Sequence, residues 1–140
     1  MIEYKLDTKQ RLVTCRMLGN VNFTELLNWH YELRDLDDYE PSFSGIADMR
    51  KANMLVTPDN LHELVSLNKT EHFVSGRWVN LVDTPIETAM STIYKEKKSV
   101  SHAMELFNTD EAASEYLEID VASALETLND SNGLLRSPVD

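Results

Sequence analysis

Short apolar runs of strand length alternate along the chain with amphipathic segments that begin at helix-capping residues. Asn22, Thr57 and Thr84 start three of these segments, and Asn108 or Thr109 starts a fourth. Asn and Thr suit this position because their side-chain oxygens accept hydrogen bonds from the free N–H groups of a helix's first turn. Strands that alternate with helices are joined by crossover connections, which produce parallel sheets. The alternation therefore predicts an α/β fold.

The first two strands are predicted within residues 1–18, separated by a polar turn at residues 7–10. Ile2, Tyr4 and Leu6 alternate with polar residues, which is the period of a half-buried strand. A hairpin is the simplest connection between two strands that are this close in sequence. Gly19 and Asn20 then break the strand pattern.

Three further strands are predicted at residues 43–50, 77–83 and 102–107, and helices at residues 22–36, 57–67, 84–98 and 108–119. The predicted order is β-β-α-β-α-β-α-β-α. We expect a mostly parallel β-sheet packed by helices, with the first strand antiparallel at an edge. On the third helix, helical spacing places Ile86, Ala89, Met90 and Ile93 toward the core.

Length and composition suit one ordered globular domain. The chain has 140 residues, enough for folding to bury about 68% of the surface of the unfolded chain. Hydrophobic residues make up 42% and charged residues 26%, which is typical of globular proteins. We assign residues 1–118 to the α/β domain. Residues 119–140 form a C-terminal tail that is helical, loose, or docked on a second copy of the chain in a homodimer.

Charge and cysteine content limit the classes of partner and the compartment. The formal net charge of -11 argues against nucleic acid, because binding phosphates requires clustered Lys and Arg. It also argues against adsorption to anionic lipid. No stretch is long and apolar enough to predict insertion into a membrane, and residues 1–11 have no apolar signal core. The single cysteine, Cys15, cannot form an internal disulfide, so we expect a reduced, cytoplasmic setting.

Asp48, Arg50 and Asp83 are predicted to lie at the carboxyl ends of two strands, which is where open α/β sheets form ligand sites. Asp48 and Arg50 point to the same side because they are two residues apart in a strand. One interpretation is an ion pair that holds the following loop against the helix start. The other is that this surface contacts a protein partner or a small anion, which nearby helix N-termini help to bind.

Thr57, Trp29 and Trp78 each have two interpretations. Thr57 is fully explained as a helix cap, which is the interpretation we favour, but it also occupies a position where the helix dipole would stabilise a phosphate group. For Trp29 and Trp78 the default is packing in or at the edge of the core. The alternatives are an interface or an apolar pocket lined by both indole rings.

The segments "ADMRKANMLVTPDNL", "RWVNLVDTPIETAM" and "HAMELFNTDEAASEYL" together resemble the SpoIIAA-like branch of the STAS-type (sulfate transporter and anti-sigma antagonist) domains. The resemblance covers about Met1 to Glu118. It implies an α/β sandwich, a cytoplasmic bacterial location and a regulatory or binding role. Some relatives are switched by phosphorylation at the helix start that matches Thr57, although the usual Asp-Ser pair is absent because Met49 follows Asp48. Others resemble lipid-binding domains of the CRAL-TRIO type.

The expected function is a non-enzymatic regulatory or binding module without a cofactor. The sequence has no nucleophile elbow, no Gly-rich phosphate loop and no zinc-site spacing among its four histidines. In this interpretation the surface around Asp48, Arg50, Thr57 and Asp83 contacts a protein partner or a small ligand. The first alternative is a carrier of an apolar or lipid-like ligand, which a cavity lined by Trp or Met would favour. The second is a small hydrolase or isomerase that uses Asp48 or Asp83 for acid–base chemistry.

Overall fold

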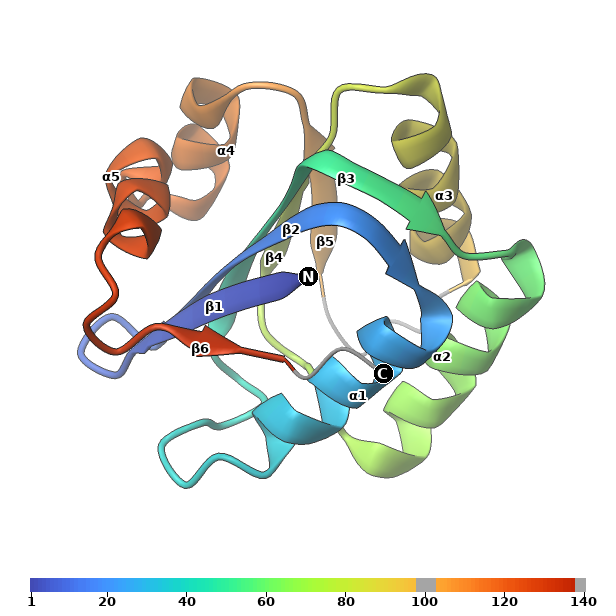
Figure 1. Ribbon diagram of the computed structural model, residues 1–140, viewed down its shortest axis with the longest axis horizontal. Helices are drawn as coiled ribbons and strands as arrows, with labels where there is room; N and C mark the ends of the chain where they lie inside the picture. The colour runs from blue at the N-terminus through green and yellow to red at the C-terminus, as the bar shows by residue number, and fades with distance from the viewer. Residues whose placement is uncertain (98–102, 138–140) are drawn as a thin grey trace.

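The computed structural model describes residues 1–97 and 103–137 (Figure 1). The strands are β1 (Ile2–Asp7), β2 (Leu12–Asn22), β3 (Ser44–Leu55), β4 (Trp78–Leu81), β5 (Met104–Phe107) and β6 (Leu135–Arg136). The helices are α1 (Phe23–Arg34), α2 (Pro58–Glu71), α3 (Pro85–Lys97), α4 (Asp110–Leu117), α5 (Val121–Glu126) and the short 3-10 helix η1 (Thr127–Asn129). The predicted α/β class and the alternation of its elements are confirmed. The predicted ends at Lys98 and His102 lie outside the described residues.

In the described part of the chain, one six-stranded sheet has the order β5-β4-β3-β2-β1-β6. Strands β2 to β5 are parallel to one another, and β1 is antiparallel to β2, as predicted. The prediction that β1 forms an edge is wrong, because β6 pairs with it. The tail returns along the sheet, where the Ser137 N–H donates to the Ile2 carbonyl oxygen at 2.9 Å.

The two central strands are longer than predicted. Gly19 does not end β2 but lies inside it with a φ of 66°, a conformation that glycine adopts without the strain of a side chain. Strand β3 continues past Arg50 to Leu55 and pairs with β2 as far as Asn22. A bulge interrupts this pairing, because the partners step from Arg16 to Leu18 in β2 but from Asp48 to Lys51 in β3.

Local capping signals start the helices where the sequence predicts. The backbone N–H groups of Glu25, Asn60 and Ala112 donate to the side-chain oxygens of the predicted capping residues, Asn22, Thr57 and Thr109. For α3, the Glu87 N–H donates to Thr84 Oγ1 at 3.1 Å. Capping is therefore the local feature that the sequence specifies most directly.

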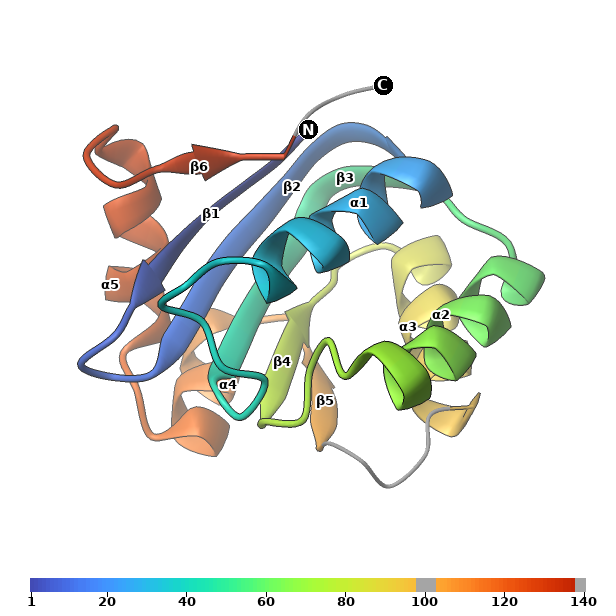
Figure 2. The ribbon, with the colours of Figure 1, turned by 90° about the horizontal axis from the view of Figure 1, so that it is seen from below.

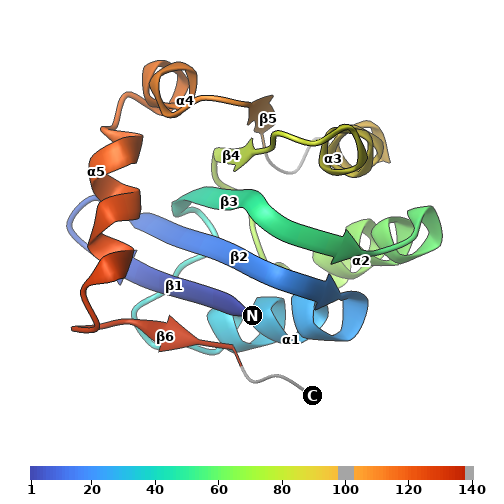
Figure 3. The same cartoon turned by 45° about the horizontal axis from the view of Figure 1, so that its top comes forward.

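Helices cover both faces of the sheet. Figure 2 and Figure 3 show α1, α2 and α3 on one face and α4 and α5 on the other. The first face carries the larger apolar core, which includes Tyr4, Trp29 and Trp78. The second carries a smaller core around Ile46 and Val79. Among the described residues, no helix combines the length and the apolar composition needed to cross a membrane.

The inner face of α3 differs from the prediction. Ile86 is 63% exposed and Ala89 is also exposed, whereas Glu87 and Ser91 are only 2% and 3% exposed. Met90 and Ile93 are half-buried and pack against the core, as predicted. The apolar pattern of α3 is therefore wrong for Ile86 and Ala89, because tertiary packing turns two polar side chains inward.

Candidate functional site

Asp48 and Arg50 form the ion pair that their spacing predicts. The Arg50 guanidinium donates from Nε to Asp48 Oδ1 at 2.9 Å and from Nη2 to Asp48 Oδ2 at 3.0 Å. Arg50 Nη2 also donates to Asp110 Oδ1 at 2.8 Å, at the first residue of α4. These hydrogen bonds to carboxylates raise the pKa of Arg50. The prediction of an ion pair is confirmed, although it joins β3 to α4 rather than to the helix start at Thr57.

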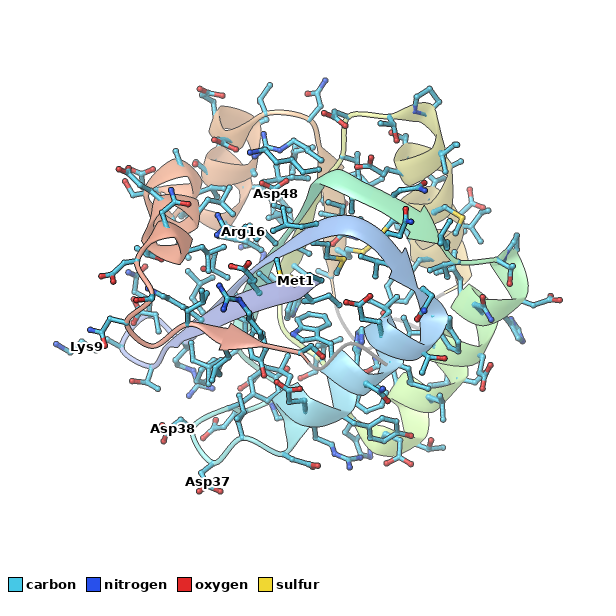
Figure 4. The ribbon with its side chains drawn as sticks, in the orientation of Figure 1. Met1, Lys9, Arg16, Asp37, Asp38 and Asp48 are labelled. Carbon is cyan, nitrogen blue, oxygen red and sulfur yellow. The ribbon has the colours of Figure 1, made fainter. Side chains whose placement is uncertain are left out.

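A surface cleft of about 440 Å³ surrounds this ion pair. Asp83, which follows β4, lines the cleft together with Asp48 and Arg50. Arg16 lies beside Asp48 on the neighbouring strand, and Figure 4 shows both on the side of the sheet that faces α4 and α5. Arg16 is held by Glu3 Oε2 at 3.0 Å. The expected common rim of Asp48 and Asp83 therefore exists, and much of its charge is already paired within the chain.

Thr57 lies apart from this cleft. Thr57 follows the far end of β3 and caps α2. Its backbone N–H donates to Asn60 Oδ1 at 3.0 Å. Thr57 Oγ1 in turn accepts from the Asn60 N–H at 3.1 Å. The predicted surface of four residues is thus divided: Asp48, Arg50 and Asp83 share one cleft, and Thr57 serves a helix start elsewhere.

The opposite face of the sheet contains a largely apolar cavity of about 90 Å³. It lies between the sheet and helices α1, α2 and α3, each of which contributes side chains to its wall. Five of the chain's six methionines and both of its tryptophans line it, namely Met17, Met49, Met54, Met90, Met104, Trp29 and Trp78. Methionine is pliable and polarizable, which suits a wall that adapts to its contents.

The bulge in β3 determines which residues of this strand reach the cavity. Successive side chains of a strand alternate between its faces, so Ala47 and Met49 face the cavity while Asp48 and Arg50 face the cleft. Without an irregularity, Met54 would point to the same face as Asp48. The extra residue of the bulge reverses the alternation, and Met54 lines the cavity with Met49.

Trp29 and Trp78 meet in the cavity wall. Their ring centroids are 6.1 Å apart with an interplanar angle of 78°, which is an edge-to-face contact. The side chain of Trp78 lies over Gly45 on the neighbouring strand, where an added Cβ atom would overlap the indole ring. Glycine at position 45 therefore makes room for the tryptophan. Both rings are almost completely buried, and the interpretation that they line an apolar pocket agrees with their positions.

Glu87 is the carboxyl group in the wall of this cavity. Its Oε2 accepts a hydrogen bond from Thr84 Oγ1 at 2.8 Å, while Oε1 is buried without a partner among the described residues. Burial, which removes the carboxylate from water, is the largest cause that raises the pKa of Glu87. Hydrogen bonds from Thr84 and from the Asp83 backbone oppose this shift, and the negative charges of Asp83 and Asp48 add to it.

Glu87 was not among the predicted site residues. In the sequence it occupies the third position of a capped helix, where a glutamate is explained by capping alone. A usable signal is the polar residue Ser91 four positions later, because residues four apart lie on one helical face. Glu87 and Ser91 both line the cavity, together with Met90 and Tyr94.

Tyr94 and His30 add further polar groups to the cavity wall. Burial raises the pKa of Tyr94 to about 12, so its phenol stays neutral over the physiological range. The His30 ring contacts the Leu26 carbonyl oxygen through Nδ1 at 2.8 Å, which fixes the imidazole within its own helix. In residues 1–97 and 103–137, no group of three or more His, Cys, Asp or Glu side chains is placed to hold a metal ion.

Comparison of the sequence with protein-family models and with curated proteins finds no match.

Proposed function

We propose that the protein is a non-enzymatic binding module whose ligand is a small, mostly apolar molecule held in the cavity between the sheet and α1–α3. The observation that carries this proposal is the composition of the cavity wall, which gathers five methionines and both tryptophans from six elements of the fold. Ligand sites are typically concave and apolar with a few polar groups that orient the ligand. The buried Glu87 carboxyl group and the two indole N–H groups supply such polar groups.

The charged cleft on the other face supports this choice by contrast. Arg50 is shared between Asp48 and Asp110, and Arg16 is bound to Glu3 and to Asn129 Oδ1 at 2.9 Å. Groups that already satisfy one another gain little from a ligand, because new contacts replace existing ones. The cavity wall has three buried polar atoms without a partner among the described residues, whereas the lining of the cleft has one, Arg16 Nε, so a ligand in the cavity adds more contacts without breaking any.

Binding is preferred over the predicted enzymatic use of Asp48 or Asp83 because of where these two carboxylates lie. An acid–base catalyst must lie within hydrogen-bond reach of the substrate. Glu87 is the carboxyl group that lines the cavity, whereas Asp48 and Asp83 line the cleft on the opposite face. The proposed enzymatic use of Asp48 is also opposed by its bidentate pairing with Arg50.

Native mass spectrometry of the purified protein tests the proposal. We expect the wild type to carry an added mass that an Ala47→Leu variant lacks, because Ala47 lines the cavity and a leucine would fill it. Ala89→Leu is the matched control, since Ala89 is exposed on α3. If none of the three proteins carries a mass beyond that of its own polypeptide, or if all three carry the same added mass, the proposal is contradicted.

A second candidate is contact with a protein partner at the charged cleft. It is favoured by the position of Asp48, Arg50 and Asp83, which line one cleft at the end of β4 as the parallel arrangement predicts. Cross-linking in cells that produce the protein tests it. An Asp83→Lys variant should lose a cross-linked product that the wild type forms, and an unchanged product pattern would exclude this surface.

The remaining parts of the sequence interpretation belong to the same proposal. The order of the first nine elements supports a STAS-type fold, in which the regulatory or binding role, the bacterial origin and the cytoplasmic location would be those of the SpoIIAA-like relatives. A homodimer is still proposed, and a sizing column tests it. Deletion of the segment after Asp120 is a poor test of it, because this segment includes β6 and would disturb the sheet of the monomer.

A further inference from the structure

Three buried polar atoms in the cavity wall have no hydrogen-bond partner among the described residues. They are Nε1 of Trp29, Nε1 of Trp78 and Oε1 of Glu87. Their residues are 2%, 5% and 2% exposed, so bulk water does not reach them freely. Buried polar groups normally have partners, because leaving one unpaired costs folding free energy. Three such groups around one cavity therefore indicate that its contents supply the missing hydrogen bonds.

The three atoms come from different elements that converge on the cavity. Trp29 belongs to α1, Trp78 to β4 and Glu87 to the first turn of α3. The two indole rings contact each other edge to face at 6.1 Å. Because Gly45 leaves space for the Trp78 ring, the ring is held by packing and not by a hydrogen bond of its own nitrogen.

The chemical character of these atoms selects the ligand. An indole nitrogen is a donor only, so Trp29 and Trp78 each offer one N–H and accept nothing. In Glu87, Oε2 already accepts the Thr84 hydroxyl, so Oε1 is the oxygen that can carry the proton when the acid is neutral. Desolvation is the largest cause that raises the pKa of Glu87, which widens the pH range in which the acid is protonated. With Glu87 protonated, all three unpartnered atoms are hydrogen-bond donors.

We propose that the cavity binds neutral molecules with a compact apolar body and a hydrogen-bond-accepting oxygen, such as small ketones and esters. This inference rests on the proposed function of the cavity. An ammonium group would add donors beside the two indole N–H groups, which cannot accept a hydrogen bond. A carboxylate would approach the negative charges of Asp83 and Asp48. A hydrocarbon would fill the space but leave the three donors unpaired.

The size of the cavity limits the part of the ligand that it encloses. An engineered protein cavity of about 150 Å³ holds one benzene molecule, so about 90 Å³ holds about four non-hydrogen atoms. Water is the competing occupant, since each molecule takes up about 30 Å³ in the liquid. An apolar body displaces such water favourably when the oxygen it carries replaces the lost hydrogen bonds.

Proton–nitrogen NMR with three probes of similar size and shape tests the inference: cyclobutanone, cyclobutylamine and methylenecyclobutane. The chain has two tryptophans, so its spectrum contains two indole N–H signals, and both belong to the cavity wall. We expect cyclobutanone to bind about tenfold more tightly than methylenecyclobutane, because it supplies hydrogen-bond acceptance. Cyclobutanone should also shift at least one indole N–H proton signal downfield, and methylenecyclobutane should not.

Variants at Glu87 sharpen the result. Glu87→Gln keeps an N–H donor and should retain the preference for the ketone, whereas Glu87→Met should reduce it. Glu63→Met is the matched control, because Glu63 is exposed on α2, and it should behave like the wild type. Since the three probes are compared in the unmodified protein, the test does not depend on the folding of any variant.

The outcomes separate this inference from the proposed function. If methylenecyclobutane or cyclobutylamine binds in the cavity at least as tightly as cyclobutanone, the cavity is a binding site but the assigned ligand class is wrong. If none of the probes moves either indole signal, the cavity does not admit ligands, and both the proposed function and this inference are overturned.

Discussion

Replacing Gly45 by alanine tests whether the Trp78 ring is positioned by packing over a glycine. An alanine Cβ at this position would overlap the Cδ2, Cε2 and Cε3 atoms of Trp78. Carbon atoms pack at about 3.5–4.0 Å, so the indole ring would have to move by about 1 Å or more. Trp29 restricts this movement, because its ring packs edge to face against Trp78 at 6.1 Å.

Two opposing effects give the expected magnitude. Overpacking a well-packed core destabilises a protein by about 1–3 kcal/mol. Gly→Ala also reduces the entropy of the unfolded chain, which stabilises the folded state by about 0.4–1 kcal/mol. We therefore expect Gly45→Ala to lower the free energy of unfolding by about 1–2 kcal/mol. For a chain of this size the melting temperature should fall by about 2–8 °C.

Denaturant unfolding and near-ultraviolet circular dichroism measure the two consequences. Gly45→Ala should lower the unfolding midpoint and change the tryptophan dichroism, because the contact between Trp29 and Trp78 is altered. Gly19→Ala is the control: nothing lies within 4 Å of its added Cβ, but its φ of 66° disfavours a side chain. It should cost about 1–2 kcal/mol without changing the tryptophan signal. A Gly45→Ala protein within about 0.5 kcal/mol of the wild type, with unchanged dichroism, would refute the packing argument.

Three further predictions concern single side chains. Desolvation raises the pKa of Glu87 above its ordinary value of 4.5, so the folded state holds a proton that the unfolded state releases. The stability of the wild type should therefore fall relative to that of Glu87→Gln as the pH rises above 4.5. If thermal unfolding of the two proteins shows the same pH dependence, this effect is excluded. Arg50→Ala should destabilise the protein by about 1–2 kcal/mol in urea, because Asp48 and Asp110 lose their shared cation, and Asp110→Asn in the same chain should recover part of the loss. Thr57→Ala should cost about 1 kcal/mol of thermal stability and Thr57→Asp much less, whereas equal losses would argue against the cap.

The sequence predicts those parts of the fold that depend on neighbouring residues. The caps at Asn22, Thr57 and Thr109 are local, since each side chain bonds to the backbone three residues later. The hairpin of β1 and β2 and the parallel order of the later strands follow from alternation and from short connections. These features need no knowledge of distant contacts.

Features that depend on distant contacts were missed. Strand β6 has only two residues and carries no recognisable strand pattern, so its pairing with β1 could not be predicted. Beyond Arg50, strand β3 alternates the polar residues Lys51 and Asn53 with the apolar residues Ala52 and Met54. This alternation is hard to recognise in the sequence, because it begins with two charged residues, Arg50 and Lys51. Asn53 is stabilised there by Asn20, whose Oδ1 accepts from Asn53 Nδ2 at 2.9 Å across the strands.

The candidate site shows the same division. The ion pair of Asp48 and Arg50 could be predicted because the two residues are neighbours on one face of a strand. The burial of Glu87 could not, because it requires α3 to turn its polar face toward the sheet and to leave Ile86 in water. A hydrophobic pattern alone assigns these two residues in the opposite way. Sequence rules commonly fail where function imposes its own demand, so this conflict itself draws attention to the cavity.

The two faces of the sheet differ in how their polar groups are satisfied, and this difference decides which face is proposed to bind. On the cleft face, Arg50 joins Asp48 to Asp110, so the charges hold α4 against β3. On that face one buried atom, Arg16 Nε, has no partner within the described chain, whereas on the cavity face Glu87 and the two tryptophans each bury such an atom. Folding alone would favour apolar groups at those positions, because they carry no such penalty. Polar groups at these positions are therefore best explained by a ligand whose oxygen they bind.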